Sequence, residues 1–249
     1  MEKEGYYYLK TKVHSYQLDR DKQISPVAIA ELMQEAAGMH SNTGGFGYKQ
    51  VISKSLVWVL NALRFEVNKF PVWDDEITIK TWIVDTNRFL SRRDFQFVNA
   101  DGEVLISGST IWILYNFETK RPQNILAMDF DVMEHNGEFA VENAIKTTRE
   151  NVEGELVDAF TVKYSDLDMV GHLNNTRYVR AIIDSYDISH FEDNILKSFE
   201  IQFRAEAKYG EILKIFEEKN DDLSSKLEIK RGDDKSVCFS KIEWGKENI

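Results

Sequence analysis

Residues 166–178 read Asp-Leu-Asp-Met-Val-Gly-His-Leu-Asn-Asn-Thr-Arg-Tyr and lie between two different structural patterns. Residues 159–164 before them have the composition of a strand, and the pattern from about 175 to 190 is helical. The stretch contains two carboxylates, one of the chain's five histidines and two adjacent amides. Asp and Asn favour turns and helix N-caps for local reasons, but the same groups at a helix start can perform acid–base chemistry. The stretch therefore predicts a strand-to-helix turn that is either structural or catalytic.

The first half of the chain contains the same kind of junction. A strand predicted at 6–18 leads through a polar turn to a helix that begins at Ser25-Pro26, with Ser as N-cap and Pro in the first helical position. The spacing is repeated as well, because Asp19 precedes that proline by seven residues and Asp168 precedes Asn175 by seven. The repeated order indicates an internal duplication.

After each helix, alternating apolar residues predict four antiparallel strands. These strands are expected at 56–67, 76–85, 89–99 and 103–117, and again at about 197–205, 211–217, 223–230 and 235–244. The strand 103–117 is apolar at nearly every position from Ile111 to Leu114, so we expect it to be central in its sheet. One long helix against a curled antiparallel sheet, found twice, predicts an α+β fold of two tandem hotdog domains. We expect the domains at 1–125 and 156–249, with a linker at 126–155.

Composition limits the classes of function. The net charge of −11 argues against nucleic acid as a partner and against stable association with an anionic membrane. No run approaches the ~18 apolar residues that a membrane span needs, and the N-terminus has no signal-peptide pattern. The single cysteine, Cys238, excludes an internal disulfide and a cysteine-rich metal site. We therefore expect a cytoplasmic protein.

Several short segments, in their order and spacing, resemble one known family. They are Leu56-Val57-Trp58-Val59-Leu60, Pro71-Val72-Trp73-Asp74-Asp75, Thr81-Trp82, Arg92-Arg93-Asp94-Phe95, Ser109-Thr110-Ile111-Trp112-Ile113, Tyr164-Ser165-Asp166-Leu167-Asp168, His172-Leu173-Asn174-Asn175 and Phe203-Arg204-Ala205-Glu206. The chain resembles the fatty acyl-acyl carrier protein thioesterases of plant plastids and bacteria. The resemblance covers most of the chain.

The resemblance implies a function and a division of labour between the two halves. Such enzymes hydrolyse the thioester between a fatty acyl chain and the phosphopantetheine arm of acyl carrier protein. The resemblance implies an acyl tunnel in the N-terminal domain, catalytic residues in the C-terminal domain, and acyl carrier protein as partner. It implies no metal and no bound cofactor.

The catalytic residues of the family are an Asp, an Asn and a His in an Asp-x-Asn-x-His motif, together with an acidic residue from a later strand. Asp168 matches the Asp, His172 the His and Glu206 the acidic residue. Val170 stands where the family usually has Asn, and a valine side chain cannot hydrogen-bond a water or a carbonyl. The position after Glu206, where older proposals placed a nucleophilic Cys, is Ala207.

With no Ser or Cys nucleophile matched, we expect direct attack by water. Glu206 is the expected general base, with Asp168 able to share the water, and His172 orients the water or the carboxylate or protonates the thiolate. Backbone N–H groups near Gly171 and the helix start are expected to hold the oxyanion. Asn174 is expected to contact substrate or to cap the helix.

Further substrate contacts are expected in the N-terminal half. Trp58 is a core residue or lines the acyl tunnel. Arg92 and Arg93 touch the acidic surface or the phosphate of the carrier, or are a solvated strand pair. The remaining histidines share no ligand spacing and are predicted to be structural or on the surface: His14, His40, His135 and His190.

Two alternatives to the carrier-protein thioesterase stay open. One is a thioesterase that acts on acyl-coenzyme A. The other is a catalytically weak hotdog protein that binds acyl chains or acyl carrier protein, and Val170 is the residue that favours it. A double hotdog supplies its own pairing of domains, and a homodimer is compatible with the sequence as well.

Overall fold

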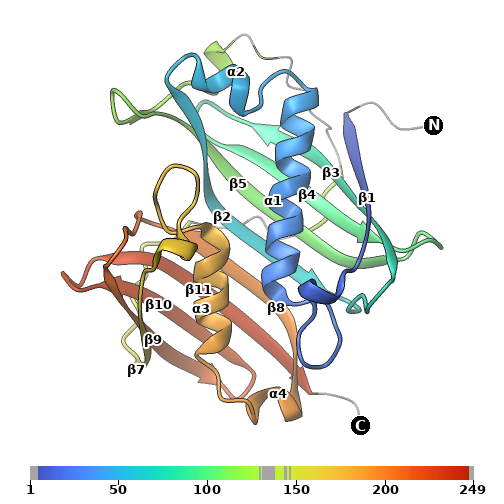
Figure 1. Ribbon diagram of the computed structural model, residues 1–249, viewed down its shortest axis with the longest axis vertical. Helices are drawn as coiled ribbons and strands as arrows, with labels where there is room; N and C mark the ends of the chain where they lie inside the picture. Colours follow the sequence, from blue (N-terminus) through green and yellow to red (C-terminus); the bar gives the residue numbers. More distant parts are fainter. Residues whose placement is uncertain (1–4, 129, 131–137, 143–144, 146, 247–249) are drawn as a thin grey trace. The chain divides into compact units, whose positions relative to one another are not determined.

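The computed structural model describes residues 5–128, 130, 138–142, 145 and 147–246. The chain divides into two compact units, Met1–Ile145 and Lys146–Ile249, and each contains a helix packed on an antiparallel sheet (Figure 1). No helix in the described part of the chain has both the length and the apolar composition needed to cross a membrane.

The N-terminal unit contains one long helix, one short helix and a sheet of five main strands. The strands pair in the order β1-β3-β4-β5-β2, all antiparallel, and β6 adds to β5. The elements are β1 Tyr6–Lys12, α1 Pro26–Thr43, α2 Tyr48–Ile52, β2 Leu56–Val67, β3 Glu76–Thr86, β4 Ser91–Val98, β5 Val104–Asn116 and β6 Arg121–Pro122. The central position predicted for the strand at 103–117 is confirmed, because β5 lies between β4 and β2.

The C-terminal unit repeats this topology. Its strands pair in the order β7-β9-β10-β11-β8, so in both units the first strand pairs with the third and the last pairs with the second. The elements are β7 Glu155–Thr161, α3 Asn175–Asp184, α4 His190–Asp193, β8 Asn194–Phe203, β9 Ile212–Asp221, β10 Ser224–Arg231 and β11 Ser236–Lys246. The predicted α+β fold of two tandem hotdog units is therefore confirmed.

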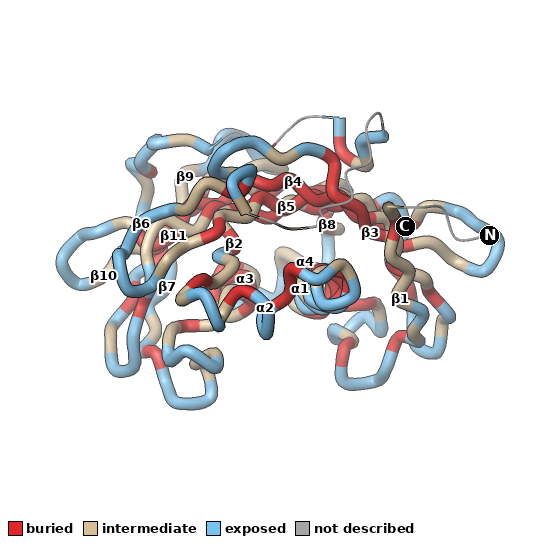
Figure 2. The backbone as a smooth tube through the Cα atoms, turned by 90° about the horizontal axis from the view of Figure 1, so that it is seen from above, coloured by how far each residue is buried: buried red, intermediate tan, exposed pale blue. Residues whose placement is uncertain are grey.

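Local sequence explains where α1 begins and how closely it packs. Ser25 Oγ accepts a hydrogen bond from the N–H of Ala28, which caps the helix. Buried residues gather where the helix faces the sheet (Figure 2). A Cβ on Gly108 of β5 would lie 2.6 Å from Met33 Cε, so the glycine allows the helix to approach the sheet.

Two predicted elements are shorter in the structure than the sequence suggested. The strand expected at 6–18 ends at Lys12, because His14 N donates to Gln17 Oε1 and Ser15–Gln17 form a 3-10 turn. The helix expected to reach residue 190 ends at Asp184. Local hydrogen bonds, which a periodicity of apolar residues does not reveal, end both elements.

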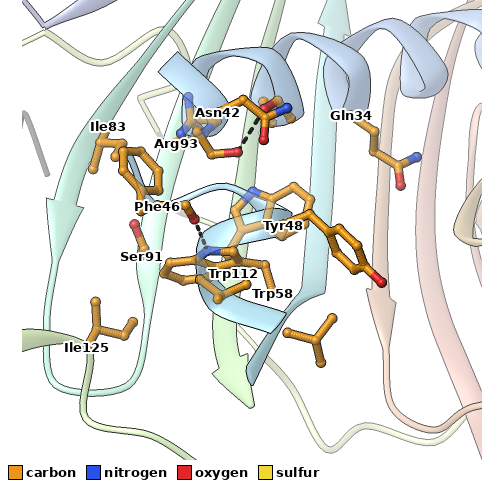
Figure 3. A pocket seen from close by; sticks show the side chains of 15 residues that line it. Gln34, Asn42, Phe46, Tyr48, Trp58, Ile83, Ser91, Arg93, Trp112 and Ile125 are labelled. Atoms are coloured by element: carbon orange, nitrogen blue, oxygen red, sulfur yellow. Dashed lines mark hydrogen bonds between the residues drawn. The ribbon is translucent and has the colours of Figure 1, made fainter. Parts of the chain in front are cut away.

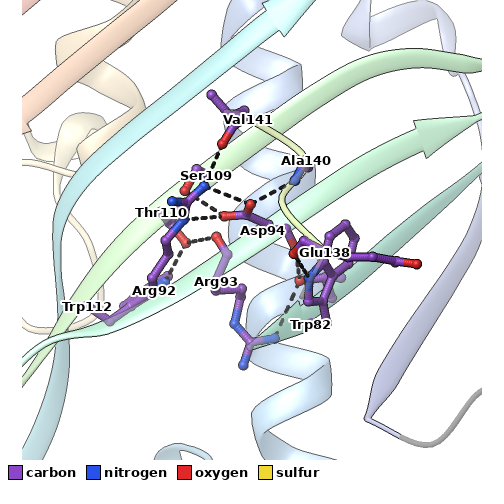
Figure 4. A network of polar contacts seen from close by, with 11 residues as sticks. Trp82, Arg92, Arg93, Asp94, Ser109, Thr110, Trp112, Glu138, Ala140 and Val141 are labelled. Atoms are coloured by element: carbon purple, nitrogen blue, oxygen red, sulfur yellow. Dashed lines mark hydrogen bonds and ion pairs between the residues drawn. The ribbon is translucent and has the colours of Figure 1, made fainter. Parts of the chain in front are cut away.

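A buried carboxylate in the N-terminal unit fixes a segment that follows the last strand (Figure 4). Asp94 on β4 accepts hydrogen bonds from Arg92 Nε (2.8 Å) and Nη2 (2.9 Å), from Ser109 Oγ (2.7 Å) and from the N–H of Ala140 (2.9 Å). Arg92 Nη2 also donates to the carbonyl of Val141 at 2.7 Å. Ion pairing and backbone contacts thus hold this segment against the sheet.

The C-terminal unit uses Glu228 in a similar way. This fully buried carboxylate accepts from Arg204 Nη1 (3.0 Å) and from the N–H of Val152 (3.0 Å), and Arg204 Nη2 donates to the carbonyl of Thr148 (3.2 Å). The predicted linker, 126–155, therefore includes residues attached to each sheet. Part of that range lies outside the described residues.

Candidate active site

The turn before α3 is built around Asp168. Its Oδ1 accepts hydrogen bonds from the N–H groups of Val170 and His172, both at 3.0 Å. Its own N–H donates to the carbonyl of His172 (2.8 Å), and its carbonyl accepts from the N–H of Gly171 (3.1 Å). These bonds close a compact turn that fixes where the His172 side chain begins.

The N-terminal unit contains the same turn with different side chains. Asp19 Oδ1 accepts from the N–H groups of Asp21 and Gln23, both at 3.0 Å, and the Asp19 N–H donates to the carbonyl of Gln23 at 2.9 Å. Asp19 therefore corresponds to Asp168 and Gln23 to His172. The Asp-centred turn belongs to the duplicated fold, and only the second copy carries a histidine.

The segment after β8 brings a carboxylate to this histidine. His172 forms an isolated β-bridge with Lys208, and the next residue, Leu173, donates its N–H to the carbonyl of Ala207 at 2.9 Å. This pairing places His172 Nε2 at 3.1 Å from Glu206 Oε2. The His172 side chain is 28% exposed and that of Glu206 is 62% exposed, so water reaches the pair.

The corresponding pairing in the first copy carries no such chemistry. The N–H of Ile24 donates to the carbonyl of Pro71 at 2.9 Å, as Leu173 does to Ala207, which makes Phe70 the counterpart of Glu206. The first copy therefore has Gln and Phe where the second has His and Glu. The imidazole–carboxylate pair is specific to the C-terminal unit.

Gly171 and Asn174 have structural tasks that differ from the expected substrate contacts. The Gly171 N–H donates to the carbonyl of Asp168, and the expectation that N–H groups near Gly171 and the helix start hold an oxyanion stays a prediction. The backbone of the turn is left-handed at Gly171, with a φ of +84°, and glycine adopts this conformation without strain. Asn174 caps α3, and its Oδ1 accepts from the N–H and the hydroxyl of Thr176, both at 2.9 Å. The first N–H groups of a helix lack intrahelical acceptors, and the N–H of Asn175, the first residue of α3, is one of them.

A cavity of about 190 Å³ lies in the N-terminal unit between α1, α2 and the sheet (Figure 3). Trp58 lines it and donates its indole N–H to the carbonyl of Phe46 at 2.9 Å. Its walls are mainly apolar and aromatic, with these among the lining residues: Phe46, Val51, Val57, Ile83, Trp112 and Ile125. An apolar cavity of this kind suits a hydrocarbon chain.

The two adjacent arginines do not form a surface patch. Arg92 is 9% exposed and forms its ion pair with Asp94, and Arg93 is 4% exposed. The expectation that they contact a carrier surface, or form a solvated strand pair, is therefore wrong. Arg93 lines the cavity instead. Their polar partners lie far away in the sequence or on other elements, such as His40 on α1 and the carbonyl of Val141, and the sequence pattern did not show them.

Comparison with models of known protein families shows which family the chain belongs to. The model of the acyl-ACP thioesterase N-terminal domain matches residues 5–134, and the model of the C-terminal domain matches residues 149–246. The chain belongs to the acyl-ACP thioesterase family.

Two curated relatives come from plants. The palmitoyl-acyl carrier protein thioesterase of Arabidopsis thaliana is 26% identical over 216 residues, which are 81% of this chain and 52% of the relative. The dodecanoyl-[acyl-carrier-protein] hydrolase of Cinnamomum camphora is 28% identical over 221 residues, 81% of this chain and 56% of the relative. Both are chloroplastic. The chain spans about half the length of these curated relatives.

Two solved structures share the fold of the chain. An acyl-ACP thioesterase from Bacteroides thetaiotaomicron superposes with a TM-score of 0.88 at 22% identity, covering 97% of this chain and 98% of that one. The 12:0-ACP thioesterase from Umbellularia californica gives 0.87 at 23% identity, with 99% and 100% covered. The tandem hotdog fold is thus the fold of thioesterase structures from a bacterium and a plant.

Two features of this family member were not found from the sequence. The cavity wall includes the end of α1 and the start of α2, and the buried His40 contacts Arg93 inside the unit. A signal for His40 existed, because it follows Ala36 and Ala37 by four and three residues and so continues the buried face of α1. His135 lies outside the described residues. Within them, no cluster of three or more potential metal ligands occurs.

Proposed function

We propose that this chain hydrolyses the thioester of a fatty acyl-acyl carrier protein and releases a free fatty acid. The observation that carries the proposal is the His172–Glu206 pair, with 3.1 Å between Nε2 and Oε2. It occurs only in the second copy of a turn that is otherwise duplicated. Family membership and the apolar cavity of the N-terminal unit support an acyl substrate.

In the proposed mechanism, Glu206 is the general base. It takes a proton from a water molecule, whose oxygen forms the new bond to the thioester carbonyl carbon. Collapse of the tetrahedral intermediate breaks the C–S bond, and the thiolate receives the proton through His172. The oxyanion is held at the start of α3 by the N–H of Asn175 and by the positive end of the helix.

His172 and Asp168 have supporting roles in this scheme. His172 keeps the exposed Glu206 carboxylate in one orientation. This lowers the entropic cost of bringing the base and the water into the geometry for attack. Asp168 uses Oδ1 to hold the turn, and its Oδ2 is the atom that would share the water. We therefore assign Asp168 mainly to positioning His172.

The substrate and the catalytic residues can be tested together. We would load purified acyl carrier protein with acyl chains and measure free fatty acid, with the matching acyl-coenzyme A series alongside. We expect carrier substrates to be hydrolysed faster than coenzyme A substrates. Glu206→Gln and His172→Gln should each lower turnover by about 10²-fold or more.

The control for this test is Glu155→Gln. Glu155 is an exposed carboxylate on β7, at the other edge of the C-terminal sheet from β8. Its replacement should leave turnover unchanged. Full activity in Glu206→Gln would remove the proposed base. Binding of acyl carrier protein without hydrolysis would support the binding-protein alternative.

Acyl carrier protein is the partner that the proposal requires. The sequence favours a cytoplasmic location without stable membrane association, and it is compatible with a homodimer. Light scattering of the purified chain measures the oligomeric state directly.

A further inference from the structure

Arg93 places a positive charge inside the cavity of the N-terminal unit. Its side chain is 4% exposed and lines the cavity together with Trp58, Ile83 and Trp112. Its neighbour Arg92 is paired with Asp94, but within the described residues no carboxylate pairs with Arg93. A buried guanidinium without a counter-charge is unfavourable unless its N–H groups find acceptors.

Among the described residues, the acceptors of Arg93 are neutral and contact one of its nitrogens, Nη1. Nη1 contacts His40 Nδ1 and Thr81 Oγ1, the latter at 3.4 Å. Burial and the neighbouring Arg93 lower the pKa of His40 to about 3, so the imidazole is a neutral acceptor near pH 7. Burial also lowers the pKa of Arg93 to about 9, and the guanidinium is still a cation at neutral pH. Further donors of Arg93 therefore remain for a ligand.

The position of Arg93 in the cavity decides which part of a ligand it meets. The exposed lining residues, Gly38, Asn42 and Tyr48, mark the mouth of the cavity. Arg93 belongs with the buried lining residues, such as Val51, in the interior. An acyl chain that enters from the mouth meets Arg93 along its hydrocarbon part. A plain methylene chain there would cover the donors without accepting a hydrogen bond.

We propose that this cavity selects acyl chains that carry a hydroxyl or keto oxygen at the carbon lying against Arg93. The inference rests on the proposed function, because it takes this cavity as the acyl site. A hydrogen bond between such an oxygen and the guanidinium replaces the hydration that burial removes. Bonds to charged donors of this kind correspond to about ten- to hundred-fold in affinity or specificity.

The test compares matched acyl chains on acyl carrier protein. Saturated chains are compared with chains of the same length that carry one hydroxyl or keto group at successive positions. We expect kcat/KM to be about ten-fold or more higher for one position of the oxygen. Arg93→Met should abolish this preference and raise the rate for the saturated chain.

A control arginine and a binding measurement complete the design. Arg64 on β2 pairs with Glu66 and does not line the cavity, so Arg64→Met should keep the preference. The thermal shift given by free hydroxy and unsubstituted fatty acids should show the same order, without any need for turnover. It also shows directly whether Arg93→Met is folded.

The outcomes separate this inference from the proposed function. Equal rates for oxygenated and saturated chains, unchanged in Arg93→Met, would overturn the inference while the thioesterase stands. That result would mean that an ordered water satisfies Arg93. Absence of hydrolysis for every chain would instead count against the proposed function, and the thermal shifts would then decide the specificity of the cavity alone.

Discussion

Acidification is expected to destabilise the N-terminal unit through His40. The imidazole is 5% exposed, stacks on Tyr7 and presents Nδ1 to Arg93. Burial, together with Arg93, lowers its pKa to about 3. Protonation in the folded state would remove the acceptor and place two cations in contact. The folded state therefore keeps His40 neutral where an unfolded chain protonates it.

The sign and size of the effect follow from the two pKa values. An unfolded histidine has a pKa of about 6.5. Because the folded value is lower, the stability is complete above about pH 6.5 and is lost progressively as the pH falls toward 3. Between pH 7.5 and pH 5, protonation of His40 stabilises the unfolded state by about 2 kcal/mol and leaves the free energy of the folded state almost unchanged.

Unfolding in urea, followed by tryptophan fluorescence, measures the loss of stability of the N-terminal unit. Trp58, Trp73, Trp82 and Trp112 all belong to the N-terminal unit, and Trp244→Phe removes the remaining tryptophan. His40→Gln keeps an oxygen acceptor for Arg93 but cannot titrate. The free energy of unfolding of the parent should fall by about 2 kcal/mol more than that of His40→Gln between the two pH values.

The exposed His14 in the same unit provides the control. His14→Gln should show the same pH dependence as the parent, because the exposed His14 side chain takes no part in the contact between His40 and Arg93. Parallel losses of stability in the parent and in His40→Gln would refute the assignment of His40 as a buried neutral acceptor.

Three further predictions concern the two buried carboxylates and the turn. Asp94→Asn leaves Arg92 buried without its counter-charge and should lower the free energy of unfolding by about 3–5 kcal/mol in urea titrations. Burial alone would raise the pKa of Glu228, but hydrogen bonds from Ser236, the Val152 N–H and Lys230 hold it below its usual value. The parent should therefore lose stability as the pH falls below about 4.3, and Glu228→Gln should lose less over the same range. Val170→Asn restores the amide that the family resemblance implies, and hydrolysis of acyl carrier substrate should rise about ten-fold. An unchanged rate would show that the site works without that amide.

Elements governed by local rules were predictable from the sequence. Ser25 and Pro26 correctly predicted the start of α1, and the strand predicted at 56–67 is β2 with the same bounds. Alternation and capping depend on neighbours in the chain, so one sequence is enough to show them. The same reasoning predicted the Asp168 turn, whose hydrogen bonds are all local.

Contacts between distant residues were not predictable in this way. Ser91 to Phe95 are all buried although two arginines and an aspartate stand among them. Their burial depends on Ser109, Ala140 and His40, which no local pattern connects to them. The strand-pairing that brings Glu206 to His172 is also long-range, and only the family resemblance had related these two residues before the structure placed them together.

Comparing the two copies of the turn separates the residues that the fold requires from the residues that folding does not explain. Both copies have an Asp whose carboxylate closes the turn, and both pair that turn with the segment after a strand. Folding alone accounts for Asp168, because Asp19 does the same without a histidine nearby in the turn. Folding does not account for His172 and Glu206, since Gln23 and Phe70 fill the same places in an equivalent unit. Among the residues that differ between equivalent positions, the two that form the imidazole–carboxylate pair are therefore the strongest candidates for chemistry.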